Sequence, residues 1–256
     1  MNLKEQTEKI NDNMIFVEKG EYKPSFSREK KEVCNLFVNK YQVTQDEWKK
    51  HMETDPSNFK GEKRPIENIT WIDSLKFCNK LSENYGFQPV YKIENGRLIR
   101  IIYTTGEEVL PFEADFSKTE GYRLPTEVEW EWFSKGGREA IENENFNLKY
   151  SGSENIEEVA WYFENSNGQT HTVGIKKSNE LGLYDCTGNV WEWCYDTTTD
   201  DILKGKSYSF EKNNFCKRIR GSSWCDTEAY CLINYRASSS SYSYNIGFRI
   251  CRTAKK

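Results

Sequence analysis

The stretch of sequence that decides the fold reads Gly121-Tyr122-Arg123-Leu124-Pro125-Thr126-Glu127-Val128-Glu129-Trp130-Glu131. Its first five residues are typical of a turn. Thr126 is followed three residues later by Glu129, which is the capping-box pattern of a helix start. We therefore predict a short helix from this point to the glycine pair Gly136-Gly137.

Two further helices and a hairpin are predicted upstream. Thr44-Gln45-Asp46-Glu47 is a second capping box, and the helix that it opens ends at Asp55-Pro56-Ser57-Asn58. Another helix begins near Thr70, has apolar residues three or four positions apart, and stops at Tyr85-Gly86. Asn95-Gly96 lies between two strand-like runs, as in a tight β-hairpin.

The rest of the chain favours strands and loops. Residues 14–43 alternate loosely between apolar and polar, which predicts short strands. After residue 150, turn signals are frequent and no long helical pattern appears. Early helices followed by an irregular β-rich region indicate the α+β class.

Other motifs accompany the stretch quoted first. In chain order they are Lys40-Tyr41-Gln42-Val43-Thr44, Asp55-Pro56-Ser57-Asn58-Phe59, Arg64-Pro65-Ile66, Ile69-Thr70-Trp71, Phe77-Cys78-Asn79, Tyr150-Ser151-Gly152, Asn179-Glu180-Leu181-Gly182-Leu183-Tyr184-Asp185, Gly188-Asn189-Val190-Trp191-Glu192-Trp193, Arg220-Gly221-Ser222-Ser223-Trp224 and Gly247-Phe248-Arg249. With these motifs the chain resembles the formylglycine-generating-enzyme (sulfatase-modifying factor) domain family over residues 14–252. The resemblance implies a C-type lectin fold of the formylglycine-generating-enzyme type, loop-rich, with two or three helices and short antiparallel strands. It also implies a single domain over residues 1–256.

Large aromatic rings provide much of the apolar content. Hydrophobic residues make up only 36% of the chain, but aromatic residues reach 14%, so we expect a core of rings rather than aliphatic runs. A loop-rich fold has many buried backbone groups, which Arg, Glu and Trp side chains can satisfy. We therefore expect four motif residues to be scaffold: Arg123, Glu129, Trp191 and Trp193.

Charge and hydropathy argue against two classes of partner. The formal net charge is −4, and no basic stretch is long enough to follow a phosphate backbone, so we expect no nucleic-acid partner. No apolar run approaches the ~20 residues of a transmembrane segment. The start, Met1-Asn2-Leu3-Lys4-Glu5, is polar and has no signal-peptide core. Two compartments fit: the cytoplasm, or the cell surface or extracellular space for a secreted or lipid-anchored protein whose leader has been removed. The resemblance favours the second.

The cysteines and histidines do not form a recognisable zinc motif. The eight cysteines are Cys34, Cys78, Cys186, Cys194, Cys216, Cys225, Cys231 and Cys251. None form C-x-x-C pairs, and the only histidines are His51 and His171, which argues against structural zinc. The even count permits disulfides without demonstrating them, and buried cysteines also serve as small hydrophobes.

The resemblance raises the question of catalysis. Founding members of the family oxidise a cysteine of a substrate protein to formylglycine, with copper and oxygen, through two cysteines separated by four residues. Soft thiolate ligands select copper(I). In this chain the first cysteine corresponds to Cys231, but the second position is Arg236. Other enzymes of this fold use histidine-rich iron sites, for which this chain has too few histidines. We therefore expect no catalytic residues and no required cofactor.

The C-terminal segment, defined here as residues 222–245, differs in composition from the rest. No Lys stands between Lys217 and Lys255, and Ser, Tyr, Cys and Asn are abundant in the segment. Tyrosine supplies rigid amphipathic contact area, and Ser and Asn supply adaptable hydrogen bonds, as in antibody paratopes. Substituting the adenines of an Asn codon gives Ser, Tyr, Cys, Asp, Thr, Ile, Leu, Ala and Arg, but not Lys, Gln, Met, Glu or Trp. Only Trp224 and Glu228 fall outside the reachable set.

This pattern resembles the variable region of diversity-generating retroelement proteins, with the spirochaete variable proteins as the nearest type. Such a protein would bind an unknown protein or glycan as a monomer. The expected ligand-binding residues are Cys225, Asp226, Tyr230, Asn234, Ser239, Ser241, Tyr242, Ser243 and Tyr244. The tyrosines would be anchors, because aromatic side chains dominate binding energy at interfaces. Two alternatives stay open: a copper oxidoreductase of the formylglycine-generating type, and a regulatory or structural domain with a fixed partner.

A calcium-binding turn of the family is similar to Asp185-Cys186-Thr187-Gly188-Asn189-Val190-Trp191-Glu192. The resemblance implies a structural calcium held by Asp185 and Glu192 carboxylates and by Gly188 and Val190 carbonyls. Hard oxygen ligands of this kind suit calcium. The alternative is that Glu192 caps backbone groups and Asp185 ends a turn.

Overall fold

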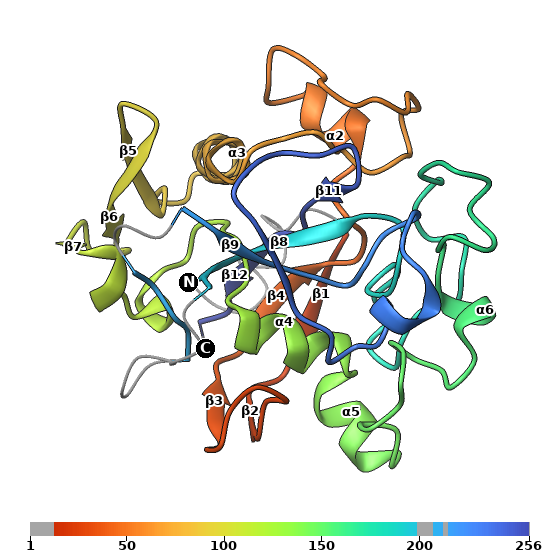
Figure 1. Cartoon of the computed structure of the whole chain (residues 1–256). Coiled ribbons are helices and arrows are strands. Elements are labelled where there is room, and N and C mark those ends of the chain that lie inside the picture. Colours follow the sequence, from red (N-terminus) through yellow and green to blue (C-terminus); the bar gives the residue numbers. More distant parts are fainter. Residues whose placement is uncertain (1–12, 199–206, 212–214, 256) are drawn as a thin grey trace.

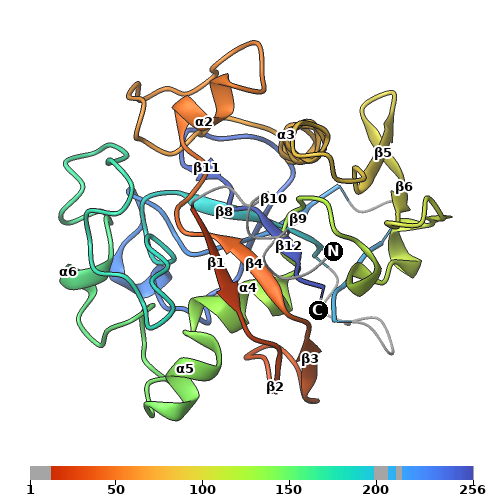
Figure 2. The same ribbon diagram turned by 180° about the vertical axis from the view of Figure 1, so that it is seen from behind.

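Segments from opposite ends of the sequence meet on one strand. The computed structural model describes residues 13–198, 207–211 and 215–255, so the polar start Met1-Asn2-Leu3-Lys4-Glu5 lies outside the described residues. Strand β4 (Leu36–Asn39) pairs antiparallel on one side with β1 (Met14–Val17) and on the other with β12 (Cys251–Thr253). The three strands lie side by side in Figure 2.

A second sheet carries the C-terminal half, in the order β10-β9-β8-β11. Its strands are β8 (Trp191–Thr197), β9 (Lys217–Arg220), β10 (Ala237–Ser239) and β11 (Ile246–Gly247). Strand β11 runs parallel to β8, whereas the other pairs are antiparallel. Helix α4 (Glu127–Ser134) packs against β8 and β9 (Figure 1).

The remaining strands form small peripheral sheets. They are the hairpin of β2 (Gly20–Tyr22) and β3 (Lys31–Val33), and a three-stranded sheet of β5 (Tyr91–Glu94), β6 (Arg97–Ile102) and β7 (Glu108–Val109). The predicted hairpin at Asn95-Gly96 is confirmed: both residues have positive φ, 49° and 71°, as a tight hairpin turn requires. The described residues also form three short 3₁₀ helices, η1 (Pro111–Glu113), η2 (Phe116–Lys118) and η3 (Glu228–Tyr230).

The predicted helix starts are confirmed, and so is the α+β class. Besides α4, the α-helices of the described ranges are α2 (Gln45–Lys49), α3 (Trp71–Asn84), α5 (Gly137–Glu142) and α6 (Ile156–Val159), which is more than the two or three expected. Helix α2 ends at Lys49, before the predicted end at Asp55. Thr44, Thr70 and Thr126 are the N-caps of α2, α3 and α4. Gly136 ends α4 with φ +85° and allows α5 to begin at the next residue, so the glycine pair divides two helices instead of ending the last one. None of the described helices is long and apolar enough to cross a membrane.

The core contains many aromatic rings, as the composition predicts, together with aliphatic side chains such as Leu36 and Ile66 and with buried arginines. The largest fully buried side chains are Trp130, Trp132, Trp193, Arg123, Arg220, Arg249, Arg252, Tyr91, Tyr122, Tyr195, Phe77 and Phe133. The expected scaffold residues are all buried; for example, Arg123 donates to both oxygens of Glu129 at 2.6 and 2.7 Å. Five cysteines are buried as well: Cys78, Cys186, Cys194, Cys231 and Cys251.

Candidate ligand-binding face

The C-terminal segment crosses the second sheet from one edge to the other. It leaves β9, forms η3 and then β10 at one edge, and reaches β11 at the opposite edge (medium to dark blue in Figure 1). Its end is fixed where the Trp191 amide donates to the Asn245 carbonyl at 2.8 Å. Both ends are therefore held by the sheet, and between them Cys231 and Ile233 are buried while most other residues reach the surface.

None of the nine predicted binding residues is buried. The three tyrosines are the most informative, because Tyr230, Tyr242 and Tyr244 are 44%, 57% and 51% exposed despite their size. Asn234 and Ser241 are also exposed, whereas Cys225, Asp226, Ser239 and Ser243 are half-buried.

Two of the three exposed tyrosines pack in separate aromatic groups. The ring of Tyr244 packs 5.8 Å from that of Trp224, which in turn packs 5.2 Å from Phe59; we call these three the outer aromatic cluster. Tyr230 instead packs against Tyr235 at 5.0 Å. Tyr230 and Tyr244 thus lie in different aromatic groups on the exposed surface of the segment, which we call the ligand-binding face.

Loops outside the segment hold its backbone in place. The Asn68 amide donates to the Ser243 carbonyl at 3.0 Å, and the Ser166 hydroxyl donates to the Trp224 carbonyl at 2.7 Å. Backbone contacts of this kind do not depend on the identity of the side chains in the segment. They therefore support a surface whose side chains can change while its path stays the same.

Sequence reasoning missed two aromatic residues of these loops. Phe163 is 62% exposed, and its amide donates to the Asp226 carbonyl at 2.9 Å. Phe59 belongs to the outer aromatic cluster. A signal for Phe59 existed, because it closes one of the family motifs, whereas Phe163 lies in a polar loop without periodicity.

The three charged residues of the segment have partners inside the fold. Asp226 accepts a hydrogen bond from the Ser223 hydroxyl, and burial raises its pKa. Glu228 accepts from the Tyr150 hydroxyl at 2.7 Å. Arg236 donates to both oxygens of Glu127 at 2.7 and 2.8 Å. The groups left to a ligand are mainly hydroxyls and aromatic rings.

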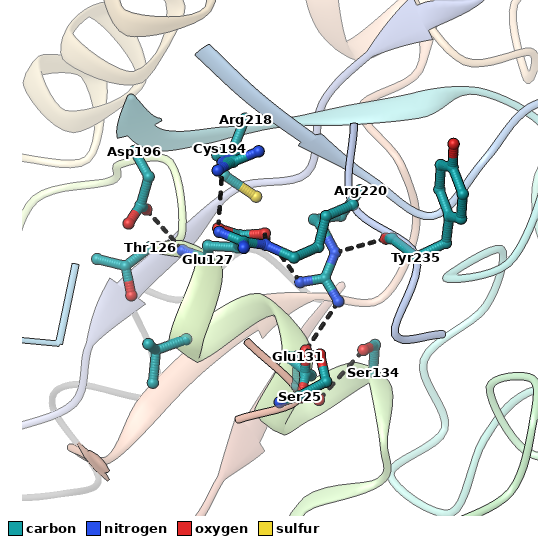
Figure 3. Close-up of polar contacts among 12 residues, drawn as sticks. Ser25, Thr126, Glu127, Glu131, Ser134, Cys194, Asp196, Arg218, Arg220 and Tyr235 are labelled. Atoms are coloured by element: carbon teal, nitrogen blue, oxygen red, sulfur yellow. Dashed lines mark hydrogen bonds and ion pairs between the residues drawn. The ribbon is translucent and has the colours of Figure 1, made fainter. Parts of the chain in front are cut away.

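A buried ion-pair network lies beneath the segment (Figure 3). Arg220 is fully buried and donates to Glu127 at 3.2 Å and to Glu131 at 2.9 Å. Its remaining donors reach the carbonyls of Tyr235 at 3.0 Å and Ile233 at 2.8 Å. One side chain therefore joins α4 to the middle of the segment.

The positions of the family's two catalytic cysteines do not form a thiolate pair here. Cys231 is 1% exposed, contacts the Ser222 hydroxyl at 3.1 Å, and has its pKa raised to about 12 by burial. A protonated thiol is a poor nucleophile and a poor metal ligand. Arg236 occupies the second position and is paired with Glu127. Within the described ranges, no three His, Cys, Asp or Glu side chains are grouped to hold a metal.

Each of the four residues predicted to hold calcium places an oxygen atom near one point, but the side-chain nitrogen of Gln42 occupies that point. Gln42 Nε2 lies 3.0, 3.3 and 2.9 Å from the carbonyl oxygens of Asp185, Gly188 and Val190, and 3.2 Å from Glu192 Oε1. The structure differs from the prediction at Asp185, whose carboxylate accepts from the Gly174 amide at 2.7 Å instead of facing this centre.

Glu67 makes the stability of the fold beside the ligand-binding face depend on pH. It is fully buried, and its Oε1 accepts from the Phe59 amide at 2.9 Å. Burial raises its pKa from 4.5 to about 7. The folded protein thus binds this proton more tightly than the unfolded chain, so stability is lost as pH rises from 4.5 to 7, by at most ~1.4 kcal/mol per pH unit.

We expect Glu67→Gln, which removes this titration, to gain stability relative to the wild type as the pH rises through the same window. Urea unfolding of both proteins at pH 5 and pH 7.5 measures the difference. If the free energies of unfolding of the two proteins differed by the same amount at both pH values, the raised pKa of Glu67 would be contradicted.

Comparisons with known proteins agree with this geometry. The sequence matches the family model of the sulfatase-modifying factor enzyme 1-like domain over residues 1–254. Chaperone protein LppX of Paenibacillus barcinonensis is 35% identical over 207 residues, 73% of this chain and 72% of that protein. The solved structure of Treponema denticola variable protein 1 has a TM-score of 0.75 at 29% identity and covers 94% of this chain and 95% of its own. Inactive C-alpha-formylglycine-generating enzyme 2 of Bos taurus is 30% identical over 151 residues, 50% of this chain but only 43% of that protein.

Proposed function

This chain belongs to the sulfatase-modifying factor enzyme 1-like domain family, and from that premise we propose that it is a non-catalytic, receptor-like ligand-binding protein whose C-terminal segment is diversified by a retroelement. The observation that carries the proposal is the placement of the segment. All nine expected binding residues are at least partly exposed, on a path whose ends are fixed by the sheet. The likeness to a variable protein of Treponema denticola over 94% of the chain supports the same reading.

The chemistry of the face suits recognition of varied partners. Tyrosine and tryptophan bury large area at low entropic cost, and hydroxyl groups adapt their hydrogen bonds to the partner. Arg236, which pairs with Glu127, is not one of the nine expected binding positions, so changes at those positions alter specificity without breaking this ion pair. We infer a protein or glycan ligand, bound without a cofactor.

A display library tests this function directly. The nine expected binding positions are randomised with the residues reachable from an Asn codon, and the library is selected against immobilised lysozyme, streptavidin and mannan. The proposal predicts folded binders to at least one of these probes, with wild-type framework sequence. A library that folds but yields no binder to any probe would contradict it.

The non-catalytic assignment gives a second prediction. We expect no formylglycine from a cysteine-containing sulfatase peptide incubated with this protein, copper and oxygen, because Cys231 is buried and protonated and Arg236 replaces the second thiol. Mass spectrometry of the peptide detects the product, and an active formylglycine-generating enzyme assayed in parallel is the positive control. Product above the protein-free background would revive the oxidoreductase alternative.

The second candidate function is that of a domain with one fixed protein partner. The relative from Paenibacillus favours it, because that protein is called a chaperone and aligns over 72% of its length. This candidate predicts an invariant C-terminal segment and a single tight partner. The same exposed tyrosines would then form a fixed interface.

A further inference from the structure

The loop before β8 turns its carbonyl oxygens towards one point. Asp185, Gly188 and Asn189 all have left-handed backbone conformations, with φ of 56°, 82° and 64°. At Gly188 a side chain is also excluded by space, because a Cβ there would lie 2.4 Å from the Trp161 carbonyl oxygen. The loop is therefore built to hold three inward carbonyls close together.

The side-chain amide of Gln42 fills the centre of these oxygens. Its Nε2 lies within 3.3 Å of three carbonyls and of Glu192 Oε1, and the side chain is fully buried. An amide nitrogen carries two protons, so four acceptors must share them. Gln42 Oε1 has no hydrogen-bond partner in the described part of the chain, so the nitrogen alone sets the orientation of the side chain.

Four oxygens around one centre is an arrangement that calcium also uses, but the residues present do not fit the ion. Calcium takes about 6–8 oxygen ligands, and the loop offers four. The Asp185 carboxylate, which would supply charge, is turned to Gly174.

The one carboxylate at the centre, Glu192, is already neutralised. Arg249 donates to its two oxygens at 2.8 and 3.1 Å, and Trp130 Nε1 donates at 2.8 Å. A divalent cation would therefore lie beside a buried guanidinium with little negative charge to compensate it. Two positive charges close together in a buried site repel each other strongly.

We propose that the side-chain amide of Gln42 replaces a structural cation in this loop, so that β8 and the contacts it makes are held without bound metal. The consequence reaches the ligand-binding face. Val190 and Glu192 flank Trp191, whose amide holds the end of the C-terminal segment at Asn245. The face is then formed equally well in the presence and absence of calcium, whatever its ligand is.

Calcium chloride is the probe for the wild-type protein. The proposal predicts no binding heat by titration calorimetry, and a Tm that differs by less than roughly 1 °C between EDTA and millimolar calcium, since a ligand that does not bind cannot stabilise. Saturable binding, or a Tm raised by calcium, would overturn it. This measurement needs no variant.

The variant Gln42→Glu tests whether the side-chain amide of Gln42 takes the place of a cation. It puts a carboxylate oxygen among four oxygens, so we expect a lower Tm in EDTA and recovery of roughly 5 °C or more in calcium. The matched control is Gln45→Glu, which makes the same change at a buried amide whose nitrogen donates to Phe59 O at 2.7 Å and Pro65 O at 3.2 Å. Gln45→Glu is expected to lose stability without a calcium response. A Gln42→Glu protein insensitive to calcium, or a control equally sensitive, contradicts the proposal.

Discussion

Replacing Arg220 by alanine is expected to lower the free energy of unfolding by about 3–5 kcal/mol, the usual cost of removing one partner of a buried ion pair. The guanidinium is fully buried and serves Glu127, Glu131 and two carbonyls of the C-terminal segment. Without it, two carboxylates and two carbonyls lose a donor at once. Equilibrium urea unfolding followed by tryptophan fluorescence measures the loss.

A surface arginine provides the control for this change. Arg138 is 47% exposed at its side chain and pairs with Glu18 at 3.4 Å, so Arg138→Ala should cost no more than about 1 kcal/mol. Hydrogen exchange gives a second readout, since residues 231–237 should exchange faster in Arg220→Ala than in the wild type. An Arg220→Ala protein as stable as Arg138→Ala would show that the network does not hold the segment.

Replacing Ile233 by serine is expected to cost about 2–4 kcal/mol, although serine is abundant in the same segment. Ile233 is 5% exposed and belongs to the core cluster around Trp130 and Val128. The substitution leaves a cavity and buries a hydroxyl. Thermal and urea unfolding measure the effect.

Exposed positions of the segment should behave differently. We expect Tyr242→Ser and Ser241→Tyr to change the free energy of unfolding by no more than about 0.5 kcal/mol, as surface substitutions do. Both changes are reachable from an Asn codon, as Ile233→Ser is. If all three variants were equally stable, or equally unstable, the division between framework and variable positions would be wrong.

Local signals explain what could be predicted of the fold. Thr126 with Glu129 forms the expected capping box, and Asn95-Gly96 forms the expected turn, because both depend on residues a few positions apart. Helix α6 has only four residues, too few for a periodic pattern to show. Tertiary packing, not periodicity, stabilises such short helices.

The site depends on contacts that no local pattern reveals. In the sequence, Arg236 is only the residue at the position of the family's second catalytic cysteine. Its partner Glu127 lies 109 positions away. In the sequence, Gln42 is one residue of the motif that runs from Lys40 to Thr44. In the structure its side-chain amide contacts Glu192, 150 positions further along the chain. Composition singled out Tyr230, Tyr242 and Tyr244, which are exposed, but the placement of two of them in separate aromatic groups follows from packing against Tyr235 and Trp224.

The most direct test of a diversified binding face is deep sequencing of the gene's 3′ end and its flanking DNA in a growing population. The account predicts a nearby near-copy with adenines at the variant positions, and variants confined to codons for residues 222–245. Within that range, changes should concentrate at exposed residues such as Tyr242 and Tyr244, while codons for Ile233 and Arg236 stay constant. A single invariant sequence with no copy nearby would contradict the account and leave a fixed-partner domain as the better explanation.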